Sequence, residues 1–228
     1  KAQWMTSLED AQKLAIATNK LILVDFWATW CGPCIKMDSE SWSKQEVKDL
    51  MRNFIPVKLD IDIERRLSRK YNVRAIPYVF ILDPHGNVLY ESLSYKNKVQ
   101  VLKLLKKYSL STIFLKSEYL SFYEEDTSVS SVKLAEKYLD FTLYIDNKDL
   151  KRNFISLADK YLTISEKKAK KEKEHKKMIL QRSKLLSLYA MLLKGKYEKT
   201  LGKLDTKFKE EDIIFENNSL YSFVYYVS

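Results

Sequence analysis

Glycine and proline are scarce in this chain, with four of each among 228 residues. Such a composition excludes collagen, proline-rich linker proteins and most all-β folds, which need many tight turns. Two cysteines are too few for a scaffold held together by several disulfides. No apolar run approaches the roughly 18 residues that span a bilayer. The longest run, residues 21–28, has the length of a strand and contains Asp25.

The remaining composition is that of a folded globular protein. Hydrophobic residues make up 46% of the chain and charged residues 31%, with a formal net charge of +10. The 10 Phe, 15 Tyr and 4 Trp residues need a core in which to pack, which excludes disorder throughout the chain. The length predicts one large domain or two small ones.

The first half of the chain alternates helical and strand patterns. Near-continuous apolar runs predict strands that are covered on both faces, and helical spacing of apolar residues predicts the segments between them. Ser7 is expected to cap a first helix that ends near Asn19. The expected strands are residues 21–27, 54–59, 78–82 and 88–90, and the further helices are residues 34–51, 64–71 and 99–108. This order predicts an α/β domain, a mixed sheet with helices on both faces, over residues 1–108.

The second half is predicted to be an all-α domain over residues 109–228. Four amphipathic stripes are expected to be separated by polar turns, and a fifth helix is expected to start near Gly195. The predicted turns lie near residues 126–128, 146–147 and 163–165. Residues 193–199 resemble the turn between helices of tetratricopeptide arrays. No 34-residue period accompanies that turn, so a repeat-like arrangement is only one interpretation.

The segment Trp30-Cys31-Gly32-Pro33-Cys34 carries the chemistry. It follows a predicted strand and opens a helix, so the two sulfurs are close enough to form a disulfide or a dithiol. The dipole at the helix N-terminus favours the Cys31 thiolate, which makes Cys31 the expected nucleophile. Cys34, one turn further on and predicted to be more buried, would resolve the mixed disulfide. Pro33 suits the first helical turn, and Gly32 permits another chain to approach closely.

Residues 26–34, Phe-Trp-Ala-Thr-Trp-Cys-Gly-Pro-Cys, closely resemble the active-site segment of the thioredoxin family. Asp25 matches the buried carboxylate that the family carries on the preceding strand, and Lys58 matches a lysine on the next strand. The pair Ile76-Pro77 matches an Ile–cis-Pro pair that lies opposite the disulfide. The resemblance covers about residues 1–108 and implies a thioredoxin fold.

The resemblance also implies roles for these residues. Asp25 would exchange a proton with Cys34 through water, and Lys58 would modulate Asp25. Ile76 and Pro77 would present backbone groups to an extended substrate, as in β-strand addition. Trp30 is expected to lie at the surface beside Cys31 and to contact substrate.

Two positions depart from the family pattern. Tyr78 follows the proline, where the family usually has Thr. A family glycine would fall around Leu93 or Ser94, and neither is glycine. Both changes are expected to narrow substrate access without touching the redox pair.

Other interpretations of these residues are weaker. A zinc site needs four ligands, and His85 and His175 are poor candidates to complete one, so no metal is expected. No cofactor is expected beyond the Cys31–Cys34 disulfide. Residues 166–177 hold seven Lys and three Glu. The interleaved charges favour a solvated helix face over a nucleic-acid or membrane surface.

We therefore predict a thiol–disulfide oxidoreductase that reduces or isomerises protein disulfides. Its expected partners are proteins with disulfides and an upstream reductase, for which a membrane-bound protein is one candidate. The alternative is a non-catalytic or electron-relay protein in which the helical domain carries the specific role. The chain begins at Lys1, so either it has been shortened or a targeting segment has been removed. With a first helix and Trp42 region that resemble secreted thioredoxin-like domains, this predicts a bacterial periplasmic or otherwise secreted protein.

Overall fold

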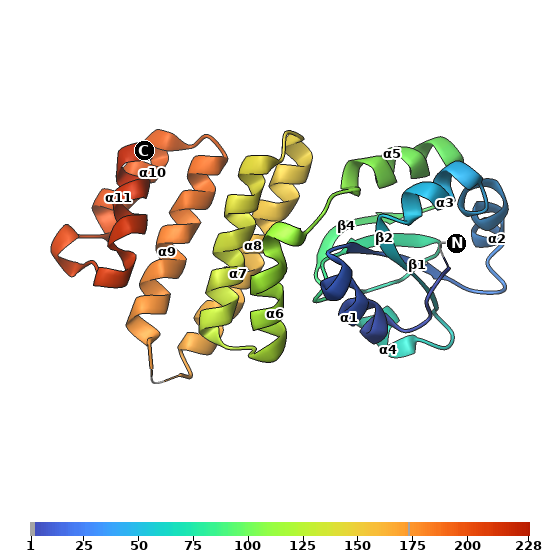
Figure 1. The fold of residues 1–228 in the computed structure, drawn as a ribbon, viewed down its shortest axis with the longest axis horizontal. Helices are drawn as coiled ribbons and strands as arrows, with labels where there is room; N and C mark the ends of the chain where they lie inside the picture. Colours follow the sequence, from blue (N-terminus) through green and yellow to red (C-terminus); the bar gives the residue numbers. More distant parts are fainter. Residues whose placement is uncertain (1–2, 173) are drawn as a thin grey trace. The chain divides into compact units, whose positions relative to one another are not determined.

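The computed structural model of this chain describes residues 3–172 and 174–228. The chain divides into two compact units, residues 1–116 and residues 117–228 (Figure 1). The boundary predicted from the sequence lies slightly earlier, between residues 108 and 109. No helix in the described part of the chain is both long and apolar enough to cross a membrane.

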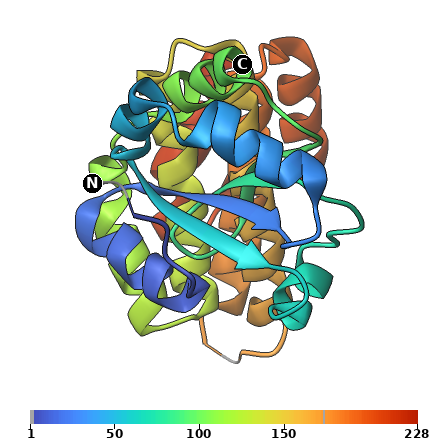
Figure 2. The same cartoon turned by 90° about the vertical axis from the view of Figure 1, so that its right-hand side faces the viewer.

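The first unit is an α/β domain built on a four-stranded mixed sheet. Its elements are α1 Leu8–Thr18, β1 Leu21–Trp27, α2 Gly32–Met37, η1 Asp38–Trp42, α3 Gln45–Met51, β2 Phe54–Asp60, α4 Arg65–Lys70, β3 Tyr78–Leu82, β4 Val88–Leu93, α5 Lys98–Tyr108 and η2 Ile113–Leu115. The strand order is β2-β1-β3-β4. Strand β1 is parallel to β2 and antiparallel to β3, and Figure 2 shows β1 and β2 side by side. The predicted strands and fold class are confirmed.

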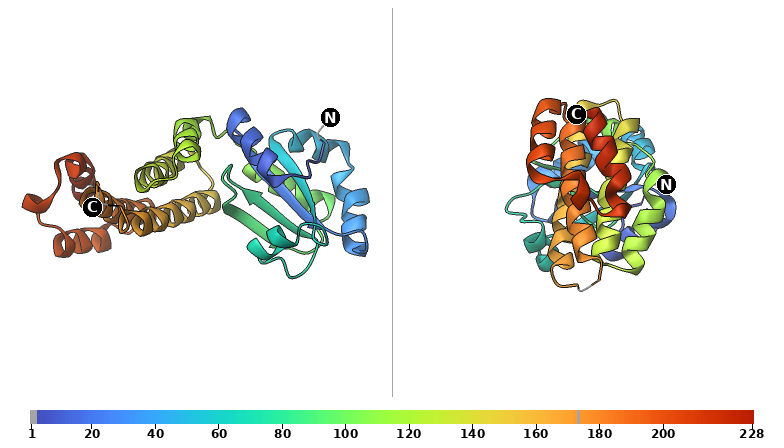
Figure 3. Two further views of the ribbon diagram at one scale, coloured as in Figure 1. Left: turned by 90° about the horizontal axis from the view of Figure 1, so that it is seen from below. Right: turned by 90° about the vertical axis from the view of Figure 1, so that its left-hand side faces the viewer.

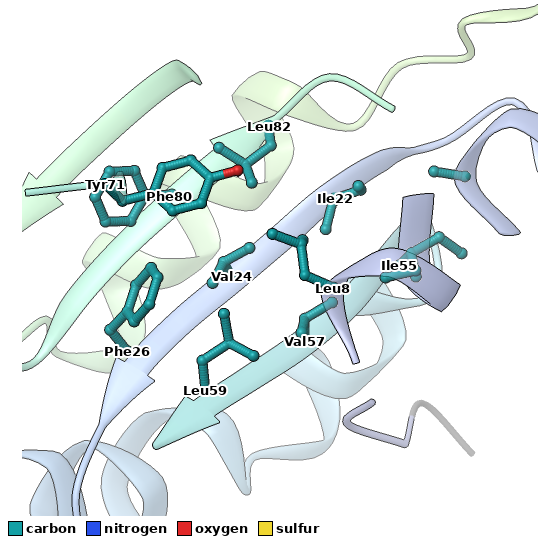
Figure 4. Close-up of a cluster of buried hydrophobic side chains, with 12 residues drawn as sticks. Leu8, Ile22, Val24, Phe26, Ile55, Val57, Leu59, Tyr71, Phe80 and Leu82 are labelled. Atoms are coloured by element: carbon teal, nitrogen blue, oxygen red, sulfur yellow. The ribbon is translucent and has the colours of Figure 1, made fainter. Parts of the chain in front are cut away.

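The two faces of β1 carry different kinds of side chain, because alternate side chains of a strand point to opposite sides of the sheet. Ile22, Val24 and Phe26 lie on one face, in a buried apolar cluster that includes Leu8 of α1 (Figure 4). The alternate position between Val24 and Phe26 is Asp25, which therefore lies on the opposite face. Ile61 and Ile76 pack both against this cluster and against the cluster of Ala28, Cys31 and Cys34, so the two clusters adjoin.

The helical sequence predicted over residues 34–51 is confirmed, but it divides into three segments instead of forming one continuous helix. Residues 38–42 form a π-helical turn between α2 and α3. Serine hydroxyls in this region donate to backbone carbonyls, and such bonds compete with regular helix geometry. Ser43 donates to the Ser39 carbonyl at 2.6 Å, and Ser41 donates to the Lys96 carbonyl at 2.8 Å.

The second unit is entirely helical in its described part. Its elements are α6 Lys116–Glu124, which starts at the last residue of the first unit, α7 Ser128–Phe141, η3 Thr142–Tyr144, α8 Lys148–Ala169, α9 Lys176–Leu193, α10 Tyr197–Lys207, η4 Glu210–Asp212, η5 Phe215–Asn217 and α11 Asn218–Val227. Helices α7, α8 and α9 contact one another, and α9 also contacts α10 and α11 (Figures 1 and 3). Buried aromatic rings fill its core, with Tyr138 stacked on Tyr161 at a centroid distance of 5.6 Å.

Two expectations for this unit are wrong. The turn predicted at residues 163–165 is absent, because α8 continues to Ala169. The Thr163 hydroxyl donates to the Asp159 carbonyl at 3.0 Å and the Ser165 hydroxyl to the Ser128 carbonyl at 2.9 Å, so both polar groups are satisfied within a helix. The basic run 166–177 does not form one helix face. It covers the end of α8, the connection and the start of α9, and its Lys173 lies outside the described residues.

Candidate active site

The disulfide lies at the start of α2, shortly after the end of β1. Cys31 is the N-cap of α2, and its Sγ accepts a hydrogen bond from the Cys34 backbone N–H at 3.2 Å. Pro33 falls in the first turn, where a missing N–H has no intrahelical partner to lose. The Sγ atoms of Cys31 and Cys34 are bonded to each other. The three-residue spacing therefore places both sulfurs at the start of one helix, as predicted.

The two cysteines are almost equally buried, with exposed fractions of 3% for Cys31 and 2% for Cys34. Cys34 is the more buried residue, as predicted, but by a margin of only one percentage point. Both pack with Ala28 in a small apolar cluster. Gly32 and Pro33 between them are exposed, and a Cβ added at Gly32 would meet nothing within 4 Å. The accessible part of the motif is therefore the turn between the sulfurs.

Trp30 stands beside the disulfide at the surface. Its side chain is 65% exposed, and its indole N–H donates to Asp62 Oδ2 at 2.7 Å. This bond fixes the ring orientation while one face of the ring remains available to solvent. Asp62 was not anticipated, because nothing in the local sequence links it to a residue 32 positions earlier.

Ile76 and Pro77 lie on the segment that enters β3. Ile76 packs against the cysteine cluster, and the peptide bond between Ile76 and Pro77 is cis. Pro77 is buried, and its carbonyl accepts the Ser94 N–H at 3.0 Å. Among the described residues, the N–H and C=O of Ile76 take part in no backbone hydrogen bond. The polar backbone left next to the disulfide therefore belongs to Ile76.

Asp25 and Lys58 are partners in the register of the parallel β1–β2 pair. The Lys58 Nζ lies 4.0 Å from Asp25 Oδ2, beyond hydrogen-bond distance. It also lies 4.6 Å from the centroid of the Trp27 ring, and Trp27 packs against the cysteine cluster. The expected pair is thus brought together on the sheet face that also carries Trp27.

Asp25 is almost completely buried, with a side chain 3% exposed. Burial raises the pKa of the Asp25 carboxyl from its ordinary 3.8 to about 7. The Lys58 charge lowers this pKa, the Asp38 charge raises it and the Trp42 indole lowers it. Near neutral pH the group therefore exists in both forms, as a proton donor or acceptor must.

Asp38 is the charged residue that sequence reasoning missed. Both of its carboxylate oxygens accept hydrogen bonds from the Lys58 ammonium, so Lys58 bonds to Asp38 rather than to Asp25. A signal was available, because Asp38 follows Cys34 by four residues and would share its face of a helix.

The two departures from the family pattern lie side by side. Tyr78 of β3 is the register partner of Leu93 at the end of β4, and Leu93 is 48% exposed. Ser94 has a φ of 94°, a left-handed conformation that favours glycine. The chain therefore keeps the backbone shape that a glycine would adopt while it adds a side chain beside Pro77.

Within residues 3–172 and 174–228, no group of three or more His, Cys, Asp or Glu side chains could hold a metal ion. The cysteines use each other as partners. The chemistry available at this site is therefore thiol–disulfide exchange supported by a titrating carboxyl group.

Comparison with known proteins agrees with this chemistry. A family model described as a thioredoxin-like domain matches residues 8–109. Thioredoxin from Bacillus subtilis (strain 168) is 36% identical over 96 residues, which cover 41% of this chain and 88% of that protein. Thioredoxin-1 from Drosophila melanogaster is 39% identical over 75 residues, covering 31% of this chain. The chain spans 64% of that relative, less than two thirds of its length.

Among solved structures, a thioredoxin from Thermus thermophilus aligns over 50% of this chain and 92% of its own, with a TM-score of 0.44 and 20% identity. Residues 110–228 lie beyond the segment that the family model matches. Through its first unit, the chain belongs to the thioredoxin family.

Proposed function

We propose that this protein is a thiol–disulfide oxidoreductase that reduces or isomerises disulfides in other proteins. The observation that carries the proposal is the Cys31–Cys34 disulfide at the start of α2, against which Trp27 packs, two residues after the buried Asp25 on β1. In reduced protein the α2 N-terminus and its free N–H groups stabilise the Cys31 thiolate, which favours this sulfur as the nucleophile.

Reduction of a substrate proceeds in two exchanges. The Cys31 thiolate attacks one substrate sulfur, the substrate S–S bond breaks, and the other substrate sulfur leaves as a thiolate that takes up a proton. A mixed disulfide then joins Cys31 to the substrate. Cys34 attacks Cys31 Sγ, which releases the second substrate thiolate and restores the Cys31–Cys34 disulfide. Two electrons pass to the substrate, and an external dithiol returns them to the protein.

Asp25 serves the second exchange. Its carboxylate accepts the Cys34 thiol proton, directly or through water, so that Cys34 attacks as a thiolate. The proton then passes to the departing substrate sulfur. A carboxyl group with a pKa of about 7 is suited to both transfers near neutral pH. Lys58 supports this role by limiting the rise of that pKa.

The backbone of Ile76 provides the docking site for an extended substrate segment. A substrate strand that pairs with the Ile76 N–H and C=O would lie along the residue that packs on the disulfide. The exposed Trp30 ring and the open Gly32 turn supply the remaining contact surface. Tyr78 and Ser94 narrow that surface and restrict it to slender segments of a substrate chain.

Insulin reduction by dithiothreitol tests the activity. The wild-type protein should accelerate the precipitation of insulin chains, and Cys31→Ser should abolish that acceleration because the nucleophile is gone. Cys34→Ser should also block turnover, while it leaves Cys31 able to form a mixed disulfide. Acceleration that persists in Cys31→Ser would contradict the proposal.

Trapping of mixed disulfides identifies the proteins that react with Cys31. Cys34→Ser protein should retain substrate proteins, and its upstream reductase, as mixed disulfides on Cys31 that mass spectrometry identifies. The double variant Cys31→Ser/Cys34→Ser is the control and should retain none of them. We place the protein in the bacterial periplasm or another secreted compartment, and fractionation of source cells checks this placement. Recovery with cytoplasmic markers would contradict it.

A further inference from the structure

Three side chains from separate segments share one small region: Asp25 of β1, Lys58 of β2 and Asp38 of η1. The Lys58 ammonium thus lies near two carboxyl groups, and it forms hydrogen bonds with only one of them. Lys58 donates to both oxygens of Asp38, whereas its Nζ stays 4.0 Å from Asp25 Oδ2. The side chains are 14% exposed for Lys58, 35% for Asp38 and 3% for Asp25.

The direction of Lys58 follows from its surroundings. Its ammonium lies near the rings of Trp27 and Trp4, with Nζ at 4.6 and 5.9 Å from their centroids. These rings limit where the ammonium can move, and a hydrogen bond to the more solvated carboxylate spares the deeper one from holding a charge in a dry site. Asp25 Oδ1 is buried and accepts no hydrogen bond from the described residues.

We propose that Asp38 is a positioning residue of the redox centre, which holds the Lys58 ammonium away from the Asp25 carboxyl group. This inference rests on the proposed function, because Asp25 acts there on the Cys34 proton. Asp38 itself touches neither sulfur nor substrate. Its effect passes through Lys58 and through its own negative charge.

The groups that face this centre all act in a known direction. Lys58 and the Trp42 indole lower the pKa of Asp25, and Asp38 raises it beyond the effect of burial. Removal of the Asp38 charge would end that repulsion and free Lys58 to bond with Asp25. Both changes stabilise the Asp25 carboxylate, so they act in the same direction.

The test compares Asp38→Asn with Glu40→Gln. Glu40 lies two residues further along η1, and its carboxylate accepts a hydrogen bond from the Tyr95 hydroxyl at 2.5 Å rather than from Lys58. Each variant removes one negative charge from the same turn. In Asp38→Asn the pH midpoint of insulin reduction should fall by about one unit or more. Glu40→Gln should keep the wild-type midpoint. Asp38→Glu, which retains the negative charge, should also have a midpoint close to that of the wild type.

A second readout does not depend on activity. The chemical shift of the Asp25 carboxyl carbon, followed by NMR against pH in the oxidised protein, should titrate at lower pH in Asp38→Asn. A purely structural role of Asp38 would change stability and leave this midpoint in place. An unchanged or higher midpoint in folded Asp38→Asn would overturn the inference.

The two proposals fail in different ways. If wild-type protein does not reduce insulin while the Asp25 titration still shifts in Asp38→Asn, the proposed function is wrong and the control of Asp25 by Asp38 stands. If wild-type protein is active and the titration does not shift, the redox function stands and this inference is wrong.

Discussion

At the scale of single residues, the buried Asp25 carboxyl group that is assigned to proton transfer lowers the free energy of unfolding at neutral pH. A carboxyl group with a pKa raised by burial holds its proton more tightly in the folded chain than in the unfolded chain. Below pH 3.8 both states are protonated and nothing is lost. As pH rises towards about 7 the unfolded chain ionises first, so stability falls over that window.

Asp25→Asn should therefore stabilise the oxidised protein at pH 8 by up to about 4 kcal/mol and should have little effect at pH 3.5. The amide keeps the shape of the carboxyl and carries no charge. Urea unfolding at both pH values measures the difference. Equal gains at the two pH values would show that the effect does not come from ionisation.

Ser94→Gly should stabilise the protein by about 1 kcal/mol. At a φ of 94° a side chain strains the backbone, and glycine relieves that strain while it loses somewhat more chain entropy on folding. Ser92→Gly, two residues earlier within β4 and without a positive φ, is the control and should destabilise. Thermal unfolding distinguishes the two, and a loss of stability in Ser94→Gly would contradict the assignment of strain.

Several of these residues could be predicted from the sequence because their signals are local. Cys31 and Cys34 share a short motif, and Asp25 and Lys58 each lie within an apolar run that marks a strand. The four-residue spacing from Cys34 signals that Asp38 lies near the redox helix, but its contact with Lys58 could not be predicted, since that contact depends on a π-helical turn and on the β1–β2 register. The near-equal burial of the two cysteines depends on Ile76, more than 40 positions away.

At the scale of elements, tertiary partners decide where helices end. The expected strands form because apolar runs of their length have few other ways to bury both faces. The helical run over residues 34–51 is interrupted at residues 43–44, just after the π-helical turn in which the Ser41 hydroxyl donates to the Lys96 carbonyl. The turn expected at residues 163–165 does not form, because α8 continues there and the Ser165 hydroxyl donates a hydrogen bond to the Ser128 carbonyl. A one-dimensional pattern of polar residues cannot distinguish these outcomes.

The turn between β3 and β4 depends on Gly86. This residue has a φ of 80°, and an added Cβ would lie 2.9 Å from the Tyr71 hydroxyl oxygen and 3.0 Å from Gln12 Nε2. Gly86→Ala should destabilise the first unit by roughly 1–3 kcal/mol, because strain and crowding add. Gly202→Ala in α10 has open space around it and should instead stabilise its helix by up to about 1 kcal/mol. Urea unfolding of both variants tests this contrast.

At the scale of the whole molecule, every group assigned to the exchange reaction lies in residues 1–116. The helical unit has its own buried core, including Tyr138, Phe154 and Tyr161. The sequence predicts that this unit is helical but contains no motif that indicates its function. The spacing of its apolar residues predicts only which residues pack in the core.

A chain of residues 1–116 should fold alone and should reduce insulin at the wild-type rate per molecule. Circular dichroism establishes that it is folded before its activity is compared. The set of proteins trapped by Cys34→Ser in the short chain should differ from the set trapped by the full chain. A folded but inactive short chain would show that the helical unit completes the active site.

The two tryptophan rings near the Lys58 ammonium have a consequence for the solution conditions in which the protein works. Dissolved ions weaken attraction between charges that water surrounds, and have much less influence on charges shielded from it. Lys58 is only 14% exposed and Asp25 only 3%. The attraction between Lys58 and Asp25 should therefore change little as ionic strength rises, whereas the charge of Asp38, whose side chain is 35% exposed, should be screened more strongly.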